Sequence, residues 1–234
     1  AYAGPFAQTM EGIHTLTFWS VDKAGNVEDQ DQATNTITVR VDTTPPGITG
    51  SRTPAANAHG WNNGPVVVSF QCSDGGSGMG ACTGPTTRDQ QGADQSVTGH
   101  ATDKVGNAAS ATVGDVDIDL TNPALSGAAK TSPNAAGWYS GDVVVHWTCS
   151  DAPSGIDGSC PADTTVTGES ANESAHATVS DLAGNDTSAT VAGLKIDRTK
   201  PVTSVTAPSD WQRGGVALAV QASDNLSGVA GTYY

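Results

Sequence analysis

Four cysteines form two local pairs, and their spacing bears on the chemistry of the chain. Cys72 and Cys82 flank a loop rich in Gly and Ser, and Cys149 and Cys160 flank its counterpart. Neither pair has a His or a second Cys pair beside it at zinc-finger spacing. Two such pairs in a Gly-rich chain favour disulfides and an oxidising, extracellular location. A redox or metal-binding role for these cysteines is the less favoured alternative.

The histidines do not form a pattern that predicts catalysis. Each lies within or beside an expected strand, and none has a Ser or Cys in a nucleophile-like context nearby. No acid/base pair recurs at a cleft-like position either, so we expect no enzyme activity. The five histidines are His14, His59, His100, His146 and His176.

The motif Asp-x-x-Gly-Asn occurs three times, beginning at Asp22, Asp103 and Asp181. In each copy an extended run meets the motif and a second extended run follows. Asp suits the first turn position because its carboxylate accepts local backbone N–H groups, and Gly suits a position that needs positive φ. Three copies at near-constant spacing predict hairpin turns in tandem domains.

Composition favours an all-β fold. The chain has 234 residues, of which 36% are hydrophobic and 15% charged, with 28 Gly and 12 Pro. Short β-branched runs alternate with Gly, Pro, Asn and Asp, and long amphipathic helical patterns are absent. The net charge of −14 disfavours nucleic acid and anionic membranes as partners. We see no apolar stretch long enough to cross a bilayer.

The spacing of the motifs predicts two whole repeats flanked by two half repeats. Asp42, Asp119 and Asp197 each begin a Pro-containing linker, at spacings of 77 and 78 residues. In each repeat a Trp precedes an apolar strand, expected at residues 66–72, 143–149 and 216–222. The expected boundaries are 1–42 for the late half of a repeat, 43–119 and 120–197 for complete domains, and 198–234 for the early half of a repeat.

The two half repeats complement each other in length and in side-chain volume, since together they have 79 residues. The complete repeats place a large side chain on the early strand, Phe70 or Trp147, and the last segment has Val220 there. The late strand has small residues in the complete repeats, whereas the first segment has Phe18. Close packing conserves the total volume of a core, and this exchange would conserve it. The small residues are Gly99, Ala101, Ala175 and Ala177.

Three features together resemble bacterial Ig-like repeat domains, which occur in tandem in large secreted and cell-surface proteins. They are the Asp-Thr-Thr-Pro-Pro linker at residues 42–46, the Cys-Ser-Asp loops that end in Ser-Gly, and the Asp-x-x-Gly-Asn turns. The resemblance covers nearly the whole chain and implies β-sandwiches of about seven strands each. It is weak for function, because such modules serve as spacers, adhesin stalks and enzyme accessories.

In a sandwich of this order, the linker Asp should meet two loop Asp residues at the end where the chain enters each domain. Three carboxylates with backbone carbonyls suit Ca²⁺, which takes six to eight oxygen ligands. The alternative is that each Asp only caps its own turn and that no cofactor is present. The three expected sets are Asp42, Asp74 and Asp103; Asp119, Asp151 and Asp181; and Asp197 and Asp224 with a completing Asp22.

Trp61, Trp138 and Trp211 allow two functional interpretations. If their rings pack at the ends of the sandwiches, the chain is a structural, non-enzymatic part of an extracellular stalk or filament. If the rings are exposed and coplanar, they would stack on sugars, and the chain would be a carbohydrate- or receptor-binding adhesin module, or an accessory of a secreted glycosidase. We favour the structural interpretation.

The half repeats predict the partner. Each would expose an apolar face and unpaired strand edges on its own. We expect residues 198–234 to pack against residues 1–42 of a neighbouring copy, with Phe18 near Val220, so that the unit is one period of a longer array. The link is either covalent, through flanking repeats of one long chain, or non-covalent, by strand complementation. Two intervening domains, each about 35–40 Å long at the usual strand rise, and stiff linkers disfavour pairing within one chain.

Overall fold

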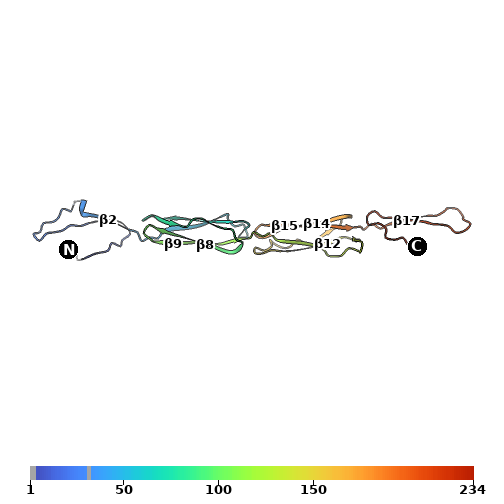
Figure 1. Cartoon of the computed structure of the whole chain (residues 1–234), viewed down its shortest axis with the longest axis horizontal. Coiled ribbons are helices and arrows are strands. Elements are labelled where there is room, and N and C mark those ends of the chain that lie inside the picture. The colour runs from blue at the N-terminus through green and yellow to red at the C-terminus, as the bar shows by residue number, and fades with distance from the viewer. Residues whose placement is uncertain (1–3, 31–32) are drawn as a thin grey trace. The chain divides into compact units, whose positions relative to one another are not determined.

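The computed structural model describes residues 4–30 and 33–234, and these residues form an all-β protein without an α-helix. This confirms that the chain is all-β, as predicted (Figure 1). The chain divides into an N-terminal unit, Ala1–Ile118, and a C-terminal unit, Asp119–Tyr234. Among the described residues there is no helix with the length and hydropathy of a membrane span.

The N-terminal unit begins with a two-stranded sheet, the N-terminal strand pair. Strand β1 (Gly12–Thr17) pairs antiparallel with β2 (Thr36–Val41), which follows the short 3₁₀ helix η1 (Ala33–Asn35). The register places Leu16 opposite Ile37. Ile37 is 54% exposed and Phe18, just beyond β1, is 52% exposed. Phe18 and Ile37 are therefore largely in solvent, whereas Leu16, Val39 and Val41 are half-buried.

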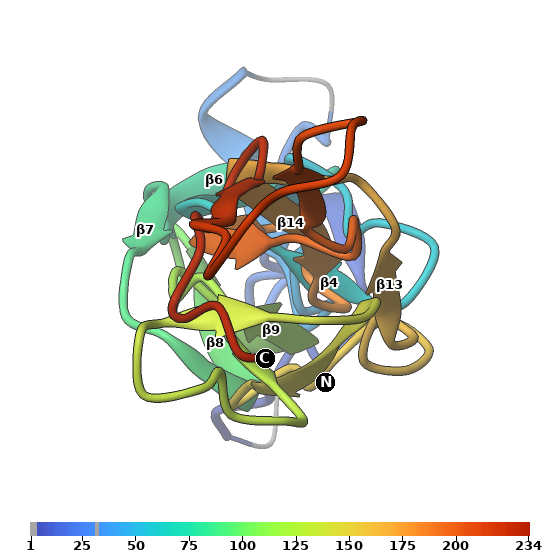
Figure 2. The ribbon, with the colours of Figure 1, turned by 90° about the vertical axis from the view of Figure 1, so that its right-hand side faces the viewer.

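Seven strands follow within residues 43–118, and they form the first two-sheet body. Figure 2 labels five of these strands, β4, β6, β7, β8 and β9. One sheet has the order β3-β5-β7 and the other the order β4-β9-β8-β6. The strands are β3 (Gly47–Thr53), β4 (Trp61–Asn62), β5 (Val66–Ser73), β6 (Met79–Cys82), β7 (Thr86–Arg88), β8 (Gly92–Asp103) and β9 (Ala108–Ile118).

The core of this body draws on both sheets. Val66, Val68 and Phe70 alternate along β5 with more exposed residues, as the period of two in a strand requires, and they are buried. They pack against Val97, Val116 and Ile118 from β8 and β9. Each fully buried Val or Ile contributes about 1.5–3 kcal/mol relative to an exposed one, so this cluster holds the two sheets together.

The C-terminal unit contains a second two-sheet body with a similar strand order. Its sheets are β10-β12-β13 and β11-β15-β14. Trp147 on β12 takes the place of Phe70, is buried, and packs with Val143, Val145 and Ile196. The strands are β10 (Ala124–Ala129), β11 (Trp138–Tyr139), β12 (Val143–Ser150), β13 (Thr164–Val166), β14 (Ser170–Ser180) and β15 (Asp186–Ile196).

The C-terminal unit ends in another two-stranded sheet, the C-terminal strand pair. Strands β16 (Val202–Thr206) and β17 (Ala219–Ser223) pair antiparallel. β17 begins at Ala219, three residues after the start of the strand expected at residues 216–222. The corresponding residues 66–68 and 143–145 pair with β7 and β13, and residues 216–218 have no such partner strand in the structure.

Candidate metal sites at the loop carboxylates

Each Asp-x-x-Gly-Asn motif folds into a turn around its own carboxylate. Oδ1 of Asp103 accepts the backbone N–H groups of Val105, Gly106 and Asn107 at 3.0, 2.7 and 2.8 Å. Oδ2 accepts Nδ2 of Asn107 at 2.7 Å. Gly106 has a φ of 101°, a conformation that favours glycine. The motif thus supplies both the acceptor and the residue that the turn needs.

The other two copies have the same geometry. Oδ1 of Asp22 accepts the backbone N–H groups of Ala24 and Asn26, both at 2.8 Å. Oδ1 of Asp181 accepts the backbone N–H of Asn185, also at 2.8 Å. In both copies Nδ2 of the Asn donates to Oδ2 of the Asp.

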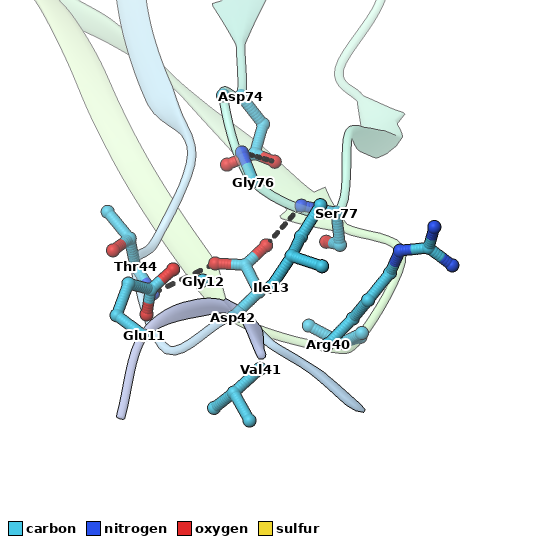
Figure 3. A pocket seen from close by; sticks show the side chains of 12 residues that line it. Glu11, Gly12, Ile13, Arg40, Val41, Asp42, Thr44, Asp74, Gly76 and Ser77 are labelled. Carbon is cyan, nitrogen blue, oxygen red and sulfur yellow. Dashed lines mark hydrogen bonds between the residues drawn. The ribbon is translucent and has the colours of Figure 1, made fainter. Parts of the chain in front are cut away.

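The first expected carboxylate set comes together in the N-terminal unit. Asp42, Asp74 and Asp103 offer oxygens that all lie within 4.8 Å of one another. Oδ2 of Asp42 accepts the backbone N–H of Ser77 at 2.5 Å, which ties the residue after β2 to the loop after β5 (Figure 3). Oδ2 of Asp74 accepts the N–H of Gly78 at 2.7 Å within the same loop.

The second expected set comes together in the C-terminal unit. Asp119, Asp151 and Asp181 also offer oxygens within 4.8 Å of one another. Oδ2 of Asp119 accepts the N–H of Ser154 at 3.0 Å. Asp119 and Asp181 are buried, and Oδ1 of Asp151 is buried without a hydrogen-bond partner. A buried carboxylate oxygen without a donor favours a cation nearby.

The third expected set is partly assembled. Oδ2 of Asp197 accepts the N–H of Ser227 at 2.8 Å. Oδ1 of Asp224 accepts the N–H of Gly228 at 2.9 Å in that same loop. Asp22, which would complete the set, belongs to the other unit. Among the described residues, three carboxylates come within 4.8 Å of one another only in the first and second sets.

An additional contact, which the sequence analysis missed, fastens the linkers to the turns. Nδ2 of Asn107 donates to the backbone carbonyl of Asp42 at 3.1 Å, and Nδ2 of Asn185 donates to the carbonyl of Asp119 at 3.0 Å. The signal in the sequence is the Asn that ends every copy of the Asp-x-x-Gly-Asn motif. An amide nitrogen has two hydrogens, so each Asn serves its own Asp and the linker together.

The hydrogen bonds favour the ionised form of Asp103 and of Asp22. Burial raises the pKa of Asp103, but hydrogen bonds from the side chain and backbone of Asn107 and from Gly106 outweigh it, so the pKa lies below the ordinary value. The pKa of Asp22 is also lowered, mainly by the side chain and then the backbone of Asn26. Ionised carboxylates are the form that a hard cation binds.

The donor set fits Ca²⁺. Carboxylate and carbonyl oxygens are its preferred ligands, and each cluster provides three carboxylates. Two carboxylates 4 Å apart repel each other by about 1 kcal/mol even in bulk water, and a divalent cation would remove that repulsion. The same carboxylates already accept several N–H groups, so turn capping is a sufficient role without a metal.

A pocket of about 750 Å³ lies next to the first cluster, between the N-terminal strand pair and the loop after β5. Asp42 and Asp74 line it, and Ile13 and Val41 contribute apolar surface (Figure 3). The pocket therefore combines acidic and apolar groups within the N-terminal unit.

The remaining residues singled out in the sequence are the four cysteines and three tryptophans. The structure contains two disulfides, Cys72–Cys82 and Cys149–Cys160. Trp61 and Trp138 are half-buried and lie in the short strands β4 and β11. Trp211 is fully exposed. The three rings are thus in different environments, and neither interpretation of the Trp residues is met at all three positions.

Comparisons with known proteins give little guidance. No family model and no curated protein matches the chain. Matching solved structures include one described as a Ca²⁺-stabilized adhesin that helps an Antarctic bacterium bind ice, with 17% identity and a TM-score of 0.31. The match covers 85% of this chain and 60% of the adhesin chain, so this chain spans less than two thirds of its length. At that TM-score the likeness supports no conclusion about this chain.

Proposed function

We propose that this chain is a structural, non-enzymatic module of an extracellular stalk or filament, built from tandem Ig-like sandwiches joined head to tail. The observation that supports this proposal is the fastening of the linkers. A spacer must keep successive domains in a fixed orientation. A linker that is held by hydrogen bonds on both sides restricts the motion between domains more than a free linker does.

The linker after β2 is held on both sides. Oε2 of Glu11 accepts the backbone N–H of Thr43 at 2.8 Å and its hydroxyl at 2.7 Å. On the other side, Asp42 bonds to Ser77 and to Asn107 as described. Bonds to a charged group contribute about 1.5–3 kcal/mol each in favourable settings and less when exposed, so several together restrain the linker.

The linker after β15 repeats this arrangement. Oε1 of Glu169 accepts the N–H groups of Arg198 and Thr199 at 2.9 and 2.8 Å. Ahead of it, Asp197 accepts the N–H of Ser227. Recurrence of a carboxylate on each side of a linker supports a role for the linkers themselves.

The proposal also includes one Ca²⁺ ion bound at each of the two carboxylate clusters. In a protein exposed to extracellular calcium, Asp42, Asp74 and Asp103 would hold one ion and Asp119, Asp151 and Asp181 another. The unpartnered Oδ1 of Asp151 supports the second site most directly. The bound ion would stiffen the linker by joining it to two loops at once.

The two disulfides support an extracellular location, because such bonds persist in oxidising compartments. Secretion of the chain remains part of the proposal.

Limited proteolysis tests the role of the linkers. In the variant Glu11→Ala with Asp42→Ala, we expect a nonspecific protease to cut within residues 43–46 sooner than in the unmodified chain, because the carboxylates that hold the linker on its two sides are gone. The bond from Asn107 to the backbone carbonyl of Asp42 remains. Asp89→Ala, at an exposed position away from the linkers, is the control. If the unmodified linker is cut as fast as that of the double variant, the linkers are not restrained and the proposal fails.

Binding of carbohydrate is the second candidate, and the full exposure of Trp211 favours it. Intrinsic Trp fluorescence titrated with a panel of oligosaccharides tests it. A saturable change that Trp211→Ala removes would support a binding module and contradict the purely structural proposal.

A further inference from the structure

The two terminal strand pairs have apolar residues that nothing covers in the structure. Phe18 and Ile37 of the N-terminal unit are about half exposed, and in the C-terminal unit Leu218 is 57% and Val205 56% exposed. In the two-sheet bodies the corresponding side of each sheet is buried against the opposite sheet. Each pair therefore resembles one part of a body that lacks its other part.

Three strand pairings link the early and late parts of the first two-sheet body. The early strands β4, β5 and β6 pair with the late strands β9, β7 and β8, respectively. The second body has two of these pairings, β11 with β15 and β12 with β13. Residues 198–234 correspond to the early part, and residues 4–41 correspond to the late part.

Residues 216–218 in the C-terminal segment and residues 5–7 in the N-terminal segment are equivalent to strands that pair with each other in the two-sheet bodies. Strands β7 and β13 begin 17 residues before the turn residues Asp103 and Asp181. Residues 5–7 stand at the same distance before Asp22. In the bodies, β7 and β13 pair with residues 66–68 and 143–145. The equivalent stretch in the C-terminal segment is residues 216–218, which does not form a strand.

Trp211 marks a second unpaired edge. Trp61 pairs with Asp117 of β9, and Trp138 pairs with Lys195 of β15. The position equivalent to Asp117, two residues before the linker Asp, is Arg40 in β2. Trp61 and Trp138 are half-buried, whereas Trp211 is fully exposed. Among the described residues, Trp211 thus differs from its two counterparts both in exposure and in strand pairing.

Side-chain volumes match across the same boundary. The Phe70 ring fills space left by two glycines: a Cβ on Gly99 would lie 2.6 Å from it, and a Cβ on Gly50 3.0 Å from it. At the positions of Phe70 and Gly50, the C-terminal pair has Val220 opposite Val205. The position of Gly99, four residues before the turn Asp, has Phe18. The ring has moved from the early part to the late part.

A polar contact completes the match. Asn107 and Asn185 each donate to the carbonyl of the linker Asp that precedes their body. In the N-terminal unit, Asn26 donates one amide hydrogen to Asp22, as its counterparts do to their own Asp residues. The equivalent acceptor for its second hydrogen is the carbonyl of Asp197.

We infer that residues 198–234 of one copy bind residues 4–41 of a second copy of this chain and complete a two-sheet body at the joint. This inference rests on the proposed structural function and names its partner surface. In the joint, Phe18 of one copy packs on Val205 and Val220 of the other, residues 5–7 extend the sheet of β17, and Asp22 joins Asp197 and Asp224.

Complementary single defects test the inference with the whole chain. Phe18→Asp disables the N-terminal surface, and Val220→Asp disables the C-terminal surface. In analytical ultracentrifugation, the unmodified chain should form larger assemblies as its concentration rises, and each variant alone should stay monomeric. A mixture of the two variants should form one-to-one dimers and nothing larger, because only one intact surface of each kind remains.

The matched controls are Thr17→Asp and Gln221→Asp. These residues are next to Phe18 and Val220 in sequence and point to the opposite face of the sheet, so both variants should assemble like the unmodified chain. A second set exchanges volumes: Val220→Phe alone should weaken assembly, and Val220→Phe with Val205→Gly and Phe18→Gly should restore it by recreating the arrangement of Phe70, Gly50 and Gly99.

Three results would overturn the inference: an unmodified chain that stays monomeric, as it also would if its two ends paired with each other; a variant mixture without dimers; or controls that abolish assembly as the apolar-face variants do. None of them bears on the linker proteolysis, so failure of this joint and failure of the proposed function are distinguishable.

Discussion

At the residue scale, the aspartates carry most of the specific structure. Asp103 organises a turn through four hydrogen bonds, and Asp42 and Asp119 connect linkers to loops. The same side chains form both three-carboxylate clusters. One residue type therefore serves local turns, linker attachment and the proposed ion sites.

The lowered pKa of Asp103 predicts acid sensitivity. A carboxyl whose pKa is lower in the folded state adds stability that is fully present above the unfolded pKa, about 3.9, and is lost as pH falls through the folded pKa. We expect Asp103→Asn to lower the melting temperature at pH 7, and the difference from the unmodified chain to shrink below about pH 4. Thermal unfolding followed by circular dichroism between pH 7 and pH 2 measures this. A difference that is constant with pH would contradict it.

Calcium should raise the melting temperature if the clusters bind it. A ligand at 100 times its Kd stabilises the state it binds by about 2.7 kcal/mol. We expect the shift between chelator and calcium to be reduced by Asp151→Asn, which removes the anionic oxygen without a partner but keeps the side-chain shape. Magnesium is the control cation. No shift with calcium would leave turn capping as the role of the aspartates.

At the element scale, the two sheets of each body depend on how one large side chain fits against small residues, which are Gly50 and Gly99 in the first body and Gly127 and Ala177 in the second. A Cβ on Gly127 would lie 2.4 Å from the Trp147 ring, as Gly99 and Gly50 lie close under Phe70. Interiors pack at the density of organic crystals, so a large residue on one strand requires small ones opposite it. Core composition is thus correlated between strands that are far apart in sequence.

This correlation can be tested within the first two-sheet body. Gly99→Phe alone should destabilise it by about 1–3 kcal/mol through overpacking. Combining it with Phe70→Val and Gly50→Val reproduces the residues that we infer at the joint, and we expect part of that loss to be recovered. Urea unfolding of the whole chain measures the change, with the transition of the C-terminal unit as an internal reference. A triple variant that is less stable than Gly99→Phe would contradict the volume exchange.

The disulfides should stabilise the loops after β5 and β12. Each closes a loop of 10 or 11 residues, for which chain entropy gives about 2–3 kcal/mol. We expect Cys72→Ser with Cys82→Ser to lower the free energy of unfolding by about that amount and to leave the second body unaffected. Mass spectrometry of the non-reduced chain should find both pairs oxidised, and free thiols at all four positions would contradict the extracellular location as well.

At the scale of the whole molecule, charge should control how copies meet. The net charge of −14 makes two copies repel each other, and salt screens this repulsion with a Debye length of about 10 Å at 0.1 M. If an apolar joint drives assembly, we expect the association measured by ultracentrifugation to strengthen as salt rises from about 0.02 to about 0.3 M. The Debye length shortens severalfold over roughly this range, so the repulsion between copies is screened. Association that weakens with salt would instead indicate an interface held by ion pairs.

Periodicity and turn chemistry predicted much of the local structure from sequence alone. The all-β class, the turns at Asp22, Asp103 and Asp181, and the apolar strand expected at residues 66–72 follow from alternation and from residues with strong turn preferences. These properties depend on neighbours in sequence, so single-sequence reasoning reaches them. The Cys pairs belong to the same class, because each closes a short loop.

Tertiary structure alone decided which distant groups meet. Whether Asn107 reaches the carbonyl of Asp42, and whether Gly50 and Gly99 both lie under Phe70, depends on how two sheets pack. Residues 216–218 likewise lie outside β17, whereas the equivalent stretches 66–68 and 143–145 are strands that pair with β7 and β13. Long-range contacts are selected by packing and hydrogen-bond satisfaction across the whole fold, and local sequence preference does not specify them.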